Sequence, residues 1–213
     1  GKKVSTGSMN PTVNCAHKNN NNLLLINSPL LAQNYEDEFQ EMWNGTFKKG
    51  GVVRNPNIKV GETGLKVFFC PEDHCAFRVE EELQKAQREI RFMTFSFTND
   101  AIVNVILMKN SEGVDIKGVM ETTQADADSE YGRFVQQGMD VLKDGNKNNM
   151  HHKVFIIDNR TVVTGSFNPT GNGDKNNDEN VLIIDDEKIA GRFLREFEKV
   201  MEEAVNKSKG SGG

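Results

Sequence analysis

The sequence predicts an α/β fold, a layered α/β/α domain with a mixed sheet, and three observations support this prediction. Stretches of strand length alternate with amphipathic helical stretches from residue 65 to residue 205, as in domains whose helices cover the faces of a sheet. Two apolar stretches on either side of the turn signal Asp158-Asn159 predict a buried hairpin. The chain of 213 residues, 36% of them hydrophobic, is long enough to enclose a sizeable core.

Charge and hydropathy narrow the classes of function. The formal net charge of −5 gives no general attraction to nucleic acid or to anionic membranes. Charges near the predicted hairpin are mixed in sign, so a strongly basic groove is not predicted, although the local field matters more than the total for a nuclease. No run of 18 apolar residues occurs, so no transmembrane helix is predicted.

The N-terminal segment is predicted to contain one strand and one helix. A polar loop over 19–22 precedes an apolar strand over 23–26, which is predicted to be buried. Ser28 followed by Pro29 predicts the start of a helix, because serine caps the first turn and proline fits its first position. Three residues at helical spacing are predicted to lie in the core: Phe39, Met42 and Trp43.

Residues 45–64 are rich in glycine, asparagine and proline and have no periodicity, which predicts a linker. After it, strands and helices alternate. Strands are predicted over 65–69, 91–97, 114–121 and 139–142, helices over 76–90, 101–109 and 131–137, and a polar acidic loop over 122–130.

The hairpin over 150–168 carries the candidate catalytic groups. His151 and Lys153 are two residues apart, so on a strand their side chains point to the same face, while His152 points to the other. The second strand of the hairpin ends in a Gly-Ser-x-Asn turn. Beyond the hairpin, the pattern predicts a flexible loop over 171–177, a strand over 181–184, a helix over 187–205 and a disordered tail.

The spacing His151-x-Lys153-x4-Asp158-x6-Gly165-Ser166-x-Asn168 resembles the complete HKD motif of the phospholipase D superfamily. The resemblance implies a metal-independent phosphodiesterase or phosphatidyl or nucleotidyl transferase without a cofactor. It also implies that two such motifs face each other across a pseudo-twofold axis. One histidine attacks phosphorus and becomes a phosphohistidine, and the other protonates the leaving oxygen.

The residue types suit this chemistry. Imidazole has an ordinary pKa of about 6.5 and is a competent nucleophile near neutral pH. Lysine and the small polar groups hold phosphoryl oxygens where charge must be stabilised. The expected catalytic residues are His151, Lys153 and, in a supporting role, Asp158; the expected phosphate-binding residues are Ser166, Asn168, Ser8 and Asn10; and the expected supporting residues are Gly165 and Glu179.

Ser8 and Asn10 enter this set because the chain contains an internal repeat. Residues 1–43 match residues 159–201 without a gap at an offset of 158, most clearly in Thr6–Thr12 and Thr164–Thr170. Two copies indicate a pseudo-dimer. At the position of Glu179 the first copy has Asn21, which indicates that the two half-sites differ in role.

The equivalent of Asp158 in the first copy would precede Gly1. We therefore expect the end of a first repeat over 1–44, a linker over 45–64, a complete second repeat over 65–206 and a flexible tail over 207–213. The second histidine is expected from a missing N-terminal segment or from a homodimer partner, and this chain alone is expected to be inactive.

The motif leaves the substrate open among three hypotheses. The first is a nuclease, favoured by the compact repeat and weakened by the acidic balance. The second is a phospholipase D or transphosphatidylase acting on phospholipid, which would need an exposed apolar rim that the sequence does not indicate. The third is an inactive phosphate-binding module.

The three cysteines allow several interpretations. Cys70 and Cys75 flank His74, but the spacing fits no standard zinc pattern. A disulfide between Cys70 and Cys75, which would favour an extracytoplasmic location, and two ordinary thiols both remain open. The location of the protein is otherwise not predicted.

Overall fold

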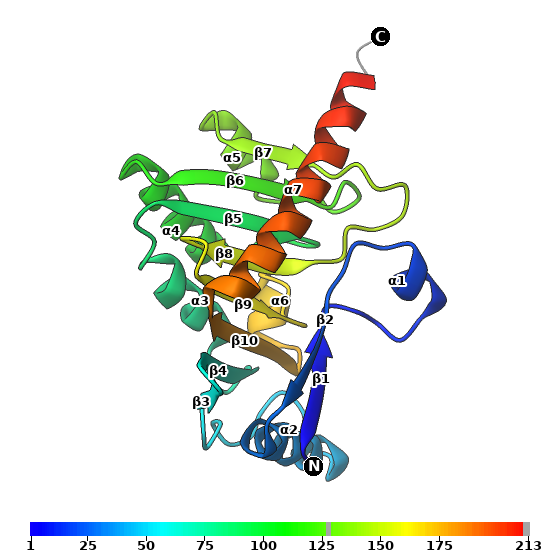
Figure 1. Cartoon of the computed structure of the whole chain (residues 1–213), viewed down its shortest axis with the longest axis vertical. Coiled ribbons are helices and arrows are strands. Elements are labelled where there is room, and N and C mark those ends of the chain that lie inside the picture. The colour runs from blue at the N-terminus through cyan, green and yellow to red at the C-terminus, as the bar shows by residue number, and fades with distance from the viewer. Residues whose placement is uncertain (127–128, 211–213) are drawn as a thin grey trace.

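The computed structural model describes residues 1–126 and 129–210, and within these residues eight strands form one mixed sheet (Figure 1). The order across the sheet is β3-β4-β10-β9-β8-β5-β6-β7. Strands β5, β6 and β7 are parallel, and the other pairs are antiparallel. The strands are β3 (Asn57–Val60), β4 (Thr63–Cys70), β5 (Glu89–Thr94), β6 (Asp115–Met120), β7 (Asp140–Lys143), β8 (Lys153–Ile157), β9 (Thr161–Gly165) and β10 (Glu179–Asp185).

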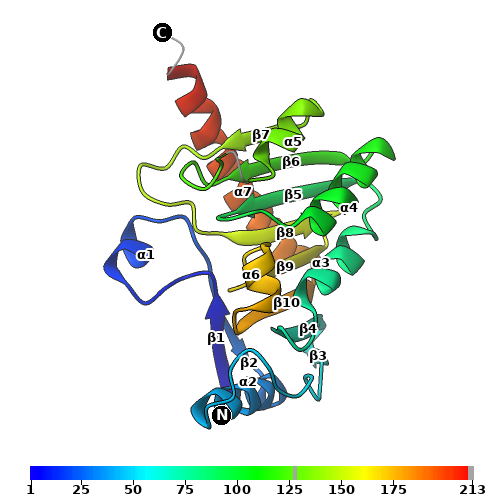
Figure 2. The same cartoon turned by 180° about the vertical axis from the view of Figure 1, so that it is seen from behind.

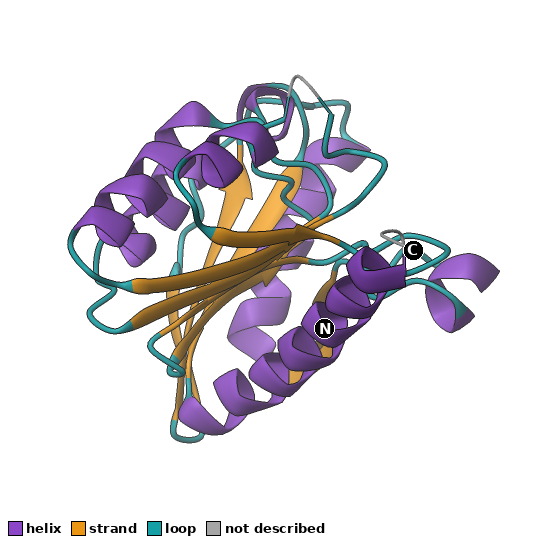
Figure 3. Cartoon of the chain, turned by 90° about the horizontal axis from the view of Figure 1, so that it is seen from above, coloured by secondary structure: helices purple, strands orange, loops and turns teal. Residues whose placement is uncertain are grey.

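Helices cover both faces of this sheet, so the predicted three-layer α/β/α fold is confirmed (Figure 3). The long helix α7 (Glu187–Gly210) crosses one face in Figure 1. The other face, seen in Figure 2, carries the shorter helices α3 (Cys75–Leu83), α4 (Asp100–Ser111), α5 (Tyr131–Gln136) and α6 (Gly171–Lys175). Among the described helices, none combines the length and the apolar character needed to cross a bilayer.

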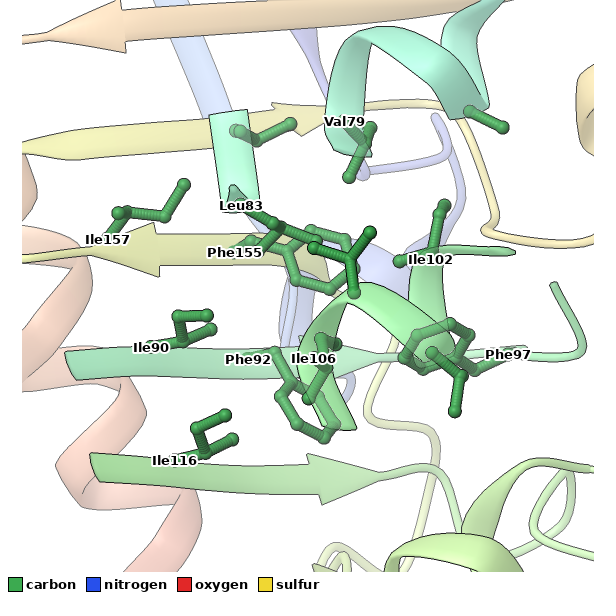
Figure 4. Close-up of a cluster of buried hydrophobic side chains, with 14 of the residues drawn as sticks. Val79, Leu83, Ile90, Phe92, Phe97, Ile102, Ile106, Ile116, Phe155 and Ile157 are labelled. Atoms are coloured by element: carbon green, nitrogen blue, oxygen red, sulfur yellow. The ribbon is translucent and has the colours of Figure 1, made fainter. Parts of the chain in front are cut away.

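Strand β8 shows how the sheet separates two apolar cores. All five of its residues are buried, as the sequence predicted. Phe155 and Ile157 join the core under α3 and α4, together with Phe92 (Figure 4). Val154 and Ile156 join the core under α7. The period of two along a strand therefore places alternate residues in opposite layers.

The N-terminal segment forms a smaller unit beside the main sheet. Its strands β1 (Lys3–Gly7) and β2 (Leu23–Asn27) pair antiparallel, with the short helix α1 (Val13–His17) between them. Helix α2 (Pro29–Trp43) follows, and the Ser28 hydroxyl accepts a hydrogen bond from Leu31 N, so the predicted cap is confirmed. Val4, Leu31 and Ala32 join the core under α7.

The segments related by the 158-residue offset contact each other reciprocally. Thr6 Oγ1 donates to Asn180 Oδ1 at 3.0 Å, and Asn22 Nδ2 donates to Thr164 Oγ1 at 2.9 Å. Each bond joins the threonine of one copy to the asparagine of the other, as a local twofold axis requires, although the donor is the threonine in the first bond and the asparagine in the second. Strands β1 and β9 both end in a glycine with positive φ, where a Cβ would collide with the carbonyl oxygen of the facing asparagine.

Several predicted boundaries are wrong, and tertiary contacts explain them. The helix predicted over 76–90 ends at Leu83, and the Asp158 carboxylate binds the backbone N–H groups of residues 87–89, where β5 starts. The linker over 45–64 contains β3, which pairs with β4 at the sheet edge. The loop over 171–177 contains α6, capped by Thr170. Helix α7 extends to Gly210 into the predicted tail, and residues 211–213 of that tail and 127–128 of the predicted acidic loop lie outside the described residues.

The burial predicted for the N-terminal segment is also wrong. Phe39 and Trp43 of α2 are 47% and 75% exposed, and Leu23 and Leu25 of β2 are 50% and 80% exposed. Each element is covered only in part: Leu31 and Ala32 of α2 join the core under α7, and Leu24 and Ile26 of β2 pack against it. The described residues supply no layer over the other apolar side chains. Cys70 and Cys75 form a disulfide, which decides among the three interpretations of these residues.

Candidate active site

The candidate site lies at the sheet edge where the parallel strands β5 and β6 end and β8 begins. His151 lies two residues before Lys153, which is the first residue of β8. Two backbone hydrogen bonds fix the approach to β8: Met150 N donates to Glu121 Oε2 at 2.7 Å, and His151 N donates to Asn20 O at 2.7 Å. The N-terminal segment therefore helps to position the histidine of the second copy.

The His151 ring is oriented by the first copy's Gly-Ser-x-Asn turn. Its Nδ1 lies 2.8 Å from the carbonyl oxygen of Ser8, and its ring contacts Phe95 edge-on at 4.7 Å between centroids. A carbonyl oxygen only accepts, so Nδ1 carries the hydrogen and Nε2 keeps its lone pair. Burial and then the charge of Lys153 lower the His151 pKa, which favours the neutral, nucleophilic ring.

Lys153 lies beside this lone pair. Its buried Nζ is 3.2 Å from His151 Nε2 and 5.2 Å from the centroid of the Phe95 ring. Burial lowers the Lys153 pKa to about 8, while the charge of Glu179 opposes that shift. At neutral pH the ammonium group is therefore mostly charged and placed to bind an anionic group that approaches His151.

Ser166 and Glu179 lie together beneath the second copy's turn. Ser166 Oγ accepts from Asn180 N at 3.0 Å and from Asn180 Nδ2 at 3.1 Å, which closes the turn. Burial raises the Glu179 pKa, while hydrogen bonds from Ser166 and Asn177 and the charge of Lys153 lower it. The predicted supporting residue Glu179 therefore acts electrostatically on Lys153.

The predicted phosphate-binding residues differ in whether their polar groups are free to bind a substrate or already bonded within the fold. Asn168 Oδ1 is buried and has no hydrogen-bond partner within residues 1–126 and 129–210, so this carboxamide is not committed to the fold. Ser8 Oγ accepts from Asn22 N at 3.1 Å, and its carbonyl binds His151, so Ser8 orients the histidine. Asn10 is exposed. Gly165 has no side chain, which allows the Asn180 carbonyl oxygen to lie close to its backbone.

The assignment of Asp158 to the catalytic group needs correction. Asp158 follows the last residue of β8, whereas His151 precedes the first, so the strand separates them. Its carboxylate accepts backbone hydrogen bonds from Gln87, Arg88 and Glu89 at 2.8–2.9 Å. Burial raises its pKa, but these hydrogen bonds outweigh burial and hold it below the ordinary value. Asp158 therefore joins the start of β5 to the hairpin.

His152 points to the opposite face from His151, as predicted. It is 1% exposed and lies 3.5 Å from the Glu196 carboxylate of α7, and burial lowers its pKa. Packing against α7 accounts for this residue.

Sequence reasoning missed three residues near the site. Phe95 gives the aromatic wall, and Glu121 holds the Met150 amide. A carboxylate directly after the apolar strand β6 was the available signal for Glu121. Cys15 has a free, buried thiol. Burial raises its pKa, but hydrogen bonds from Asn10, Thr12 and Asn19 and the charge of Lys153 lower it overall.

The candidate site contains no set of side chains suited to bind a metal ion among the described residues. Within the described part of the chain, no three His, Cys, Asp or Glu side chains lie together as a metal site requires. The chemistry that the site itself offers is a neutral imidazole lone pair next to a buried cation. This arrangement suits nucleophilic attack on an anionic phosphorus centre.

Comparisons with known proteins agree with this chemistry. Residues 79–201 match the family described as cardiolipin synthase, PLD-like domain. The chain is 32% identical over 165 residues to the mitochondrial cardiolipin hydrolase of Chlamydomonas reinhardtii, covering 71% of this chain and 74% of that protein. It is 27% identical over 140 residues to a phospholipase D of Rickettsia prowazekii, covering 65% of this chain and 68% of that protein.

Two solved structures extend the comparison. The phospholipase D family member NUC from Salmonella typhimurium has 29% identity and a TM-score of 0.63, covering 67% of this chain and 96% of that one. Phosphatidylserine synthase from Haemophilus influenzae has 12% identity and a TM-score of 0.66, covering 95% of this chain and 59% of that one. The second likeness concerns the fold alone, and it includes the N-terminal segment.

Proposed function

Because the chain belongs to the phospholipase D superfamily, we propose that it hydrolyses phosphodiesters through a covalent phosphohistidine on His151. One observation carries the assignment of the nucleophile. The Ser8 carbonyl binds Nδ1 at 2.8 Å, so Nε2 presents its lone pair beside Lys153. Attack by a histidine divides one difficult displacement into two easier steps.

In the first step, Nε2 forms a bond to phosphorus and the bond from phosphorus to the leaving oxygen breaks. Lys153 binds the phosphoryl oxygens, and the Asn168 carboxamide can contact the substrate beside them. The proton stays on Nδ1 and is donated in a hydrogen bond to the Ser8 carbonyl, which stabilises the imidazolium that forms. In the second step, water attacks phosphorus and gives up a proton to the solvent, the N–P bond breaks with its electron pair returning to Nε2, and His151 is again neutral with its hydrogen on Nδ1.

An ordinary alkoxide leaving group also needs a proton. We propose that it comes from a second histidine, carried by an N-terminal segment outside this sequence or by a second copy of the chain. The reciprocal contacts of Thr6 with Asn180 and of Asn22 with Thr164 support a twofold arrangement at the site. Without that second histidine the chain would perform the first step only on activated substrates.

Phospholipid is the substrate that we favour. The compact repeat pointed first to nucleic acid, and no apolar rim for phospholipid was apparent from the sequence, but Trp43 and Phe39 prove to be exposed. The relatives named cardiolipin hydrolase and phospholipase D support the same choice. Nucleic acid is the second candidate, because Phe95 is only partly buried and its ring lies beside His151 and Lys153, where a base can stack.

A reporter with an activated leaving group tests the proposal without the second histidine. Bis(p-nitrophenyl) phosphate should release one equivalent of p-nitrophenolate in a burst, because nitrophenolate leaves without a proton. His151→Ala should lower the burst rate by at least about 10³-fold. His17→Ala is the matched control, because His17 is exposed at the end of α1.

An equal burst in His151→Ala would contradict the assignment. Competition then separates the substrates: anionic phospholipid should slow the burst, whereas protection by single-stranded DNA alone would favour the nuclease. EDTA should leave the burst unchanged, and a loss restored by one added metal would overturn the metal-free mechanism.

A further inference from the structure

One exposed surface has no role in the chemistry described above. It comprises Trp43 at the end of α2 and Phe47, Lys48, Lys49 and Val52 in the following loop, which we call the aromatic-basic loop. We propose that the aromatic-basic loop docks the protein on an anionic lipid surface. This inference rests on the proposed action on phospholipid and deepens it.

The apolar side chains of this loop face solvent. Trp43 is 75% exposed, Phe47 is 54% exposed and Val52 is 67% exposed. Phe39 lies one helical turn before Trp43, stacks on it at 5.7 Å between ring centroids and is itself half-exposed. Tryptophan and phenylalanine side chains of this kind are stabilised in the interfacial region of a bilayer.

The charge of the segment is opposite to that of the whole chain. Between Met42 and Gly61 there are four basic residues and no acidic residue, whereas the complete chain has a net charge of −5. Arg54 pairs with Asp37. Lys48 and Lys49 are exposed, and no ion pair joins either to a carboxylate among the residues that the structure describes. Charge complementarity therefore selects an anionic surface as the occupant.

Two acidic residues near the loop, Glu41 and Asp178, bind its backbone. Glu41 accepts from Gly51 N at 3.2 Å, and Asp178 accepts from Lys48 N at 2.5 Å. Glu38 lies beside them; burial and then the neighbouring carboxylates, Glu72 first, raise its pKa to about 7, so it carries only part of a charge at neutral pH. These contacts hold the loop against the domain.

The loop lies at the edge of the sheet that carries the site. Asp178, which binds Lys48 N, directly precedes Glu179 at the start of β10. Asp73, which binds Val53 N, follows the end of β4 at the same edge. Strand β10 is two strands from β8, a lateral distance of about 10 Å. A lipid surface bound here would lie beside His151, where a headgroup phosphate is needed.

Vesicle flotation tests the proposal with the full chain. The protein should float with phosphatidylcholine vesicles that contain phosphatidylglycerol and much less with phosphatidylcholine alone. The double variant Trp43→Ser/Phe47→Ser should bind at least about tenfold more weakly, because two exposed apolar side chains are lost. Lys48→Glu/Lys49→Glu should weaken binding to the anionic vesicles by a similar factor.

The control variants carry the same kinds of substitution, phenylalanine to serine and lysine to glutamate, at exposed positions outside the aromatic-basic loop. Phe77→Ser removes a side chain that is 52% exposed on α3, and Lys188→Glu reverses an exposed charge at the start of α7. Both should bind vesicles like the wild type. Because all six substituted positions are exposed, circular dichroism should confirm that each of the four variants folds.

Three outcomes would overturn the proposal: binding unchanged in both loop variants, binding independent of phosphatidylglycerol, or an oligomer by light scattering that Trp43→Ser/Phe47→Ser dissociates while vesicle binding persists. The last would make a second copy the occupant. The nitrophenyl burst separates this inference from the function. An intact burst with no vesicle binding refutes only the docking surface, whereas vesicle binding with no burst refutes only the chemistry.

Discussion

The two copies of the repeat share their local structure but differ in what surrounds them. Strand β1, helix α1, strand β2 and helix α2 repeat as β9, α6, β10 and α7 at the offset of 158. Yet Phe197 of α7 is 3% exposed, whereas its equivalent Phe39 is 47% exposed. Ile183 of β10 is 3% exposed, whereas its equivalent Leu25 is 80% exposed. Local pattern therefore sets the element, and the neighbouring layer sets its burial.

The copies also differ in charge at the site. In the second copy Glu179 acts electrostatically on Lys153. In the first copy Asn21 takes that position, and its Nδ2 donates to Cys15 O at 2.6 Å, which fixes α1. The first copy thus contributes a neutral carbonyl to His151, and the second contributes the ionised groups. This asymmetry is consistent with one nucleophile and one acid in a complete site.

Apart from the loss of His151 itself, the largest effect should come from removing the charge of Lys153, which only the second copy supplies. Lys153→Ala should slow the nitrophenyl burst by about 10²–10³-fold, because a preorganised partner of the phosphoryl oxygens is lost. In the wild type, the burst rate should rise as His151 loses its proton, below its ordinary pKa of about 6.5, and fall as Lys153 loses its proton near pH 8. Stopped-flow rates across pH measure both limbs.

A burst rate that stays flat from pH 7 to about pH 10 would contradict the role of the Lys153 charge. Lys109→Ala is the matched control, because Lys109 is a similarly buried lysine on α4 that pairs with Glu112 away from the site.

The burial difference between the copies predicts unequal losses of stability. Phe197→Ala should lower the free energy of unfolding by about 3–5 kcal/mol, because it leaves a cavity in the core under α7. Phe39→Ala removes the equivalent ring from a half-exposed site, so the expected loss is about 1 kcal/mol or less. Urea titration compares them, and equal losses would show that Phe39 is covered in solution.

Asp158 provides a structural contrast to His151 within one motif. Asp158→Asn should lower the free energy of unfolding by about 1–2 kcal/mol, because hydrogen bonds to an ionised acceptor are weakened. Asparagine also tolerates the positive φ at this position. In the wild type the pKa of Asp158 is depressed. The stabilisation that its carboxylate gives to the folded state is therefore present above the ordinary pKa of aspartate and is lost as the pH falls below that value.

Burst kinetics at low temperature should be unchanged in Asp158→Asn. A loss of activity as large as that of Lys153→Ala, in a variant that remains folded, would return Asp158 to the catalytic group.

The smallest effect should be a shift in a pH profile. Glu179→Gln removes the negative charge that raises the Lys153 pKa, so the basic limb of the burst rate should move to lower pH. Glu198→Gln on the exposed side of α7 should leave the profile in place. A limb that does not move, or that moves to higher pH, would show that Glu179 does not act on Lys153.

The sequence could predict most of the fold and the candidate site, because the motif is local in sequence and the repeat is visible as a direct match between two segments. The spacing of His151 and Lys153, the caps at Ser28 and the alternation in β8 all follow from rules that span a few residues. The contact of Ser8 with His151 joins residues far apart in the chain, so no local rule predicts it. The end of α3 was predicted too late for the same reason. Asp158 lies in the hairpin, far along the chain, and its contact with Arg88 N belongs to the start of β5.

Exposure was the property that periodicity predicted least well. The helical spacing of Phe39 and Trp43 is correct, yet an apolar face is buried only where another layer meets it. For the same reason the apolar rim that favours phospholipid was not apparent from the sequence. The structure also shows that Asp158, although part of the motif, stabilises the fold away from the site.

The most direct test of the central claim is to locate the covalent adduct. After a burst with bis(p-nitrophenyl) phosphate and quenching at alkaline pH, peptide mass spectrometry should find a phosphoryl adduct on His151, which acid should remove. His152, buried against α7, and Cys15, the free thiol near Lys153, should stay unmodified. An adduct on His152, His17 or Cys15, or nitrophenolate release with no adduct at all, would contradict the account.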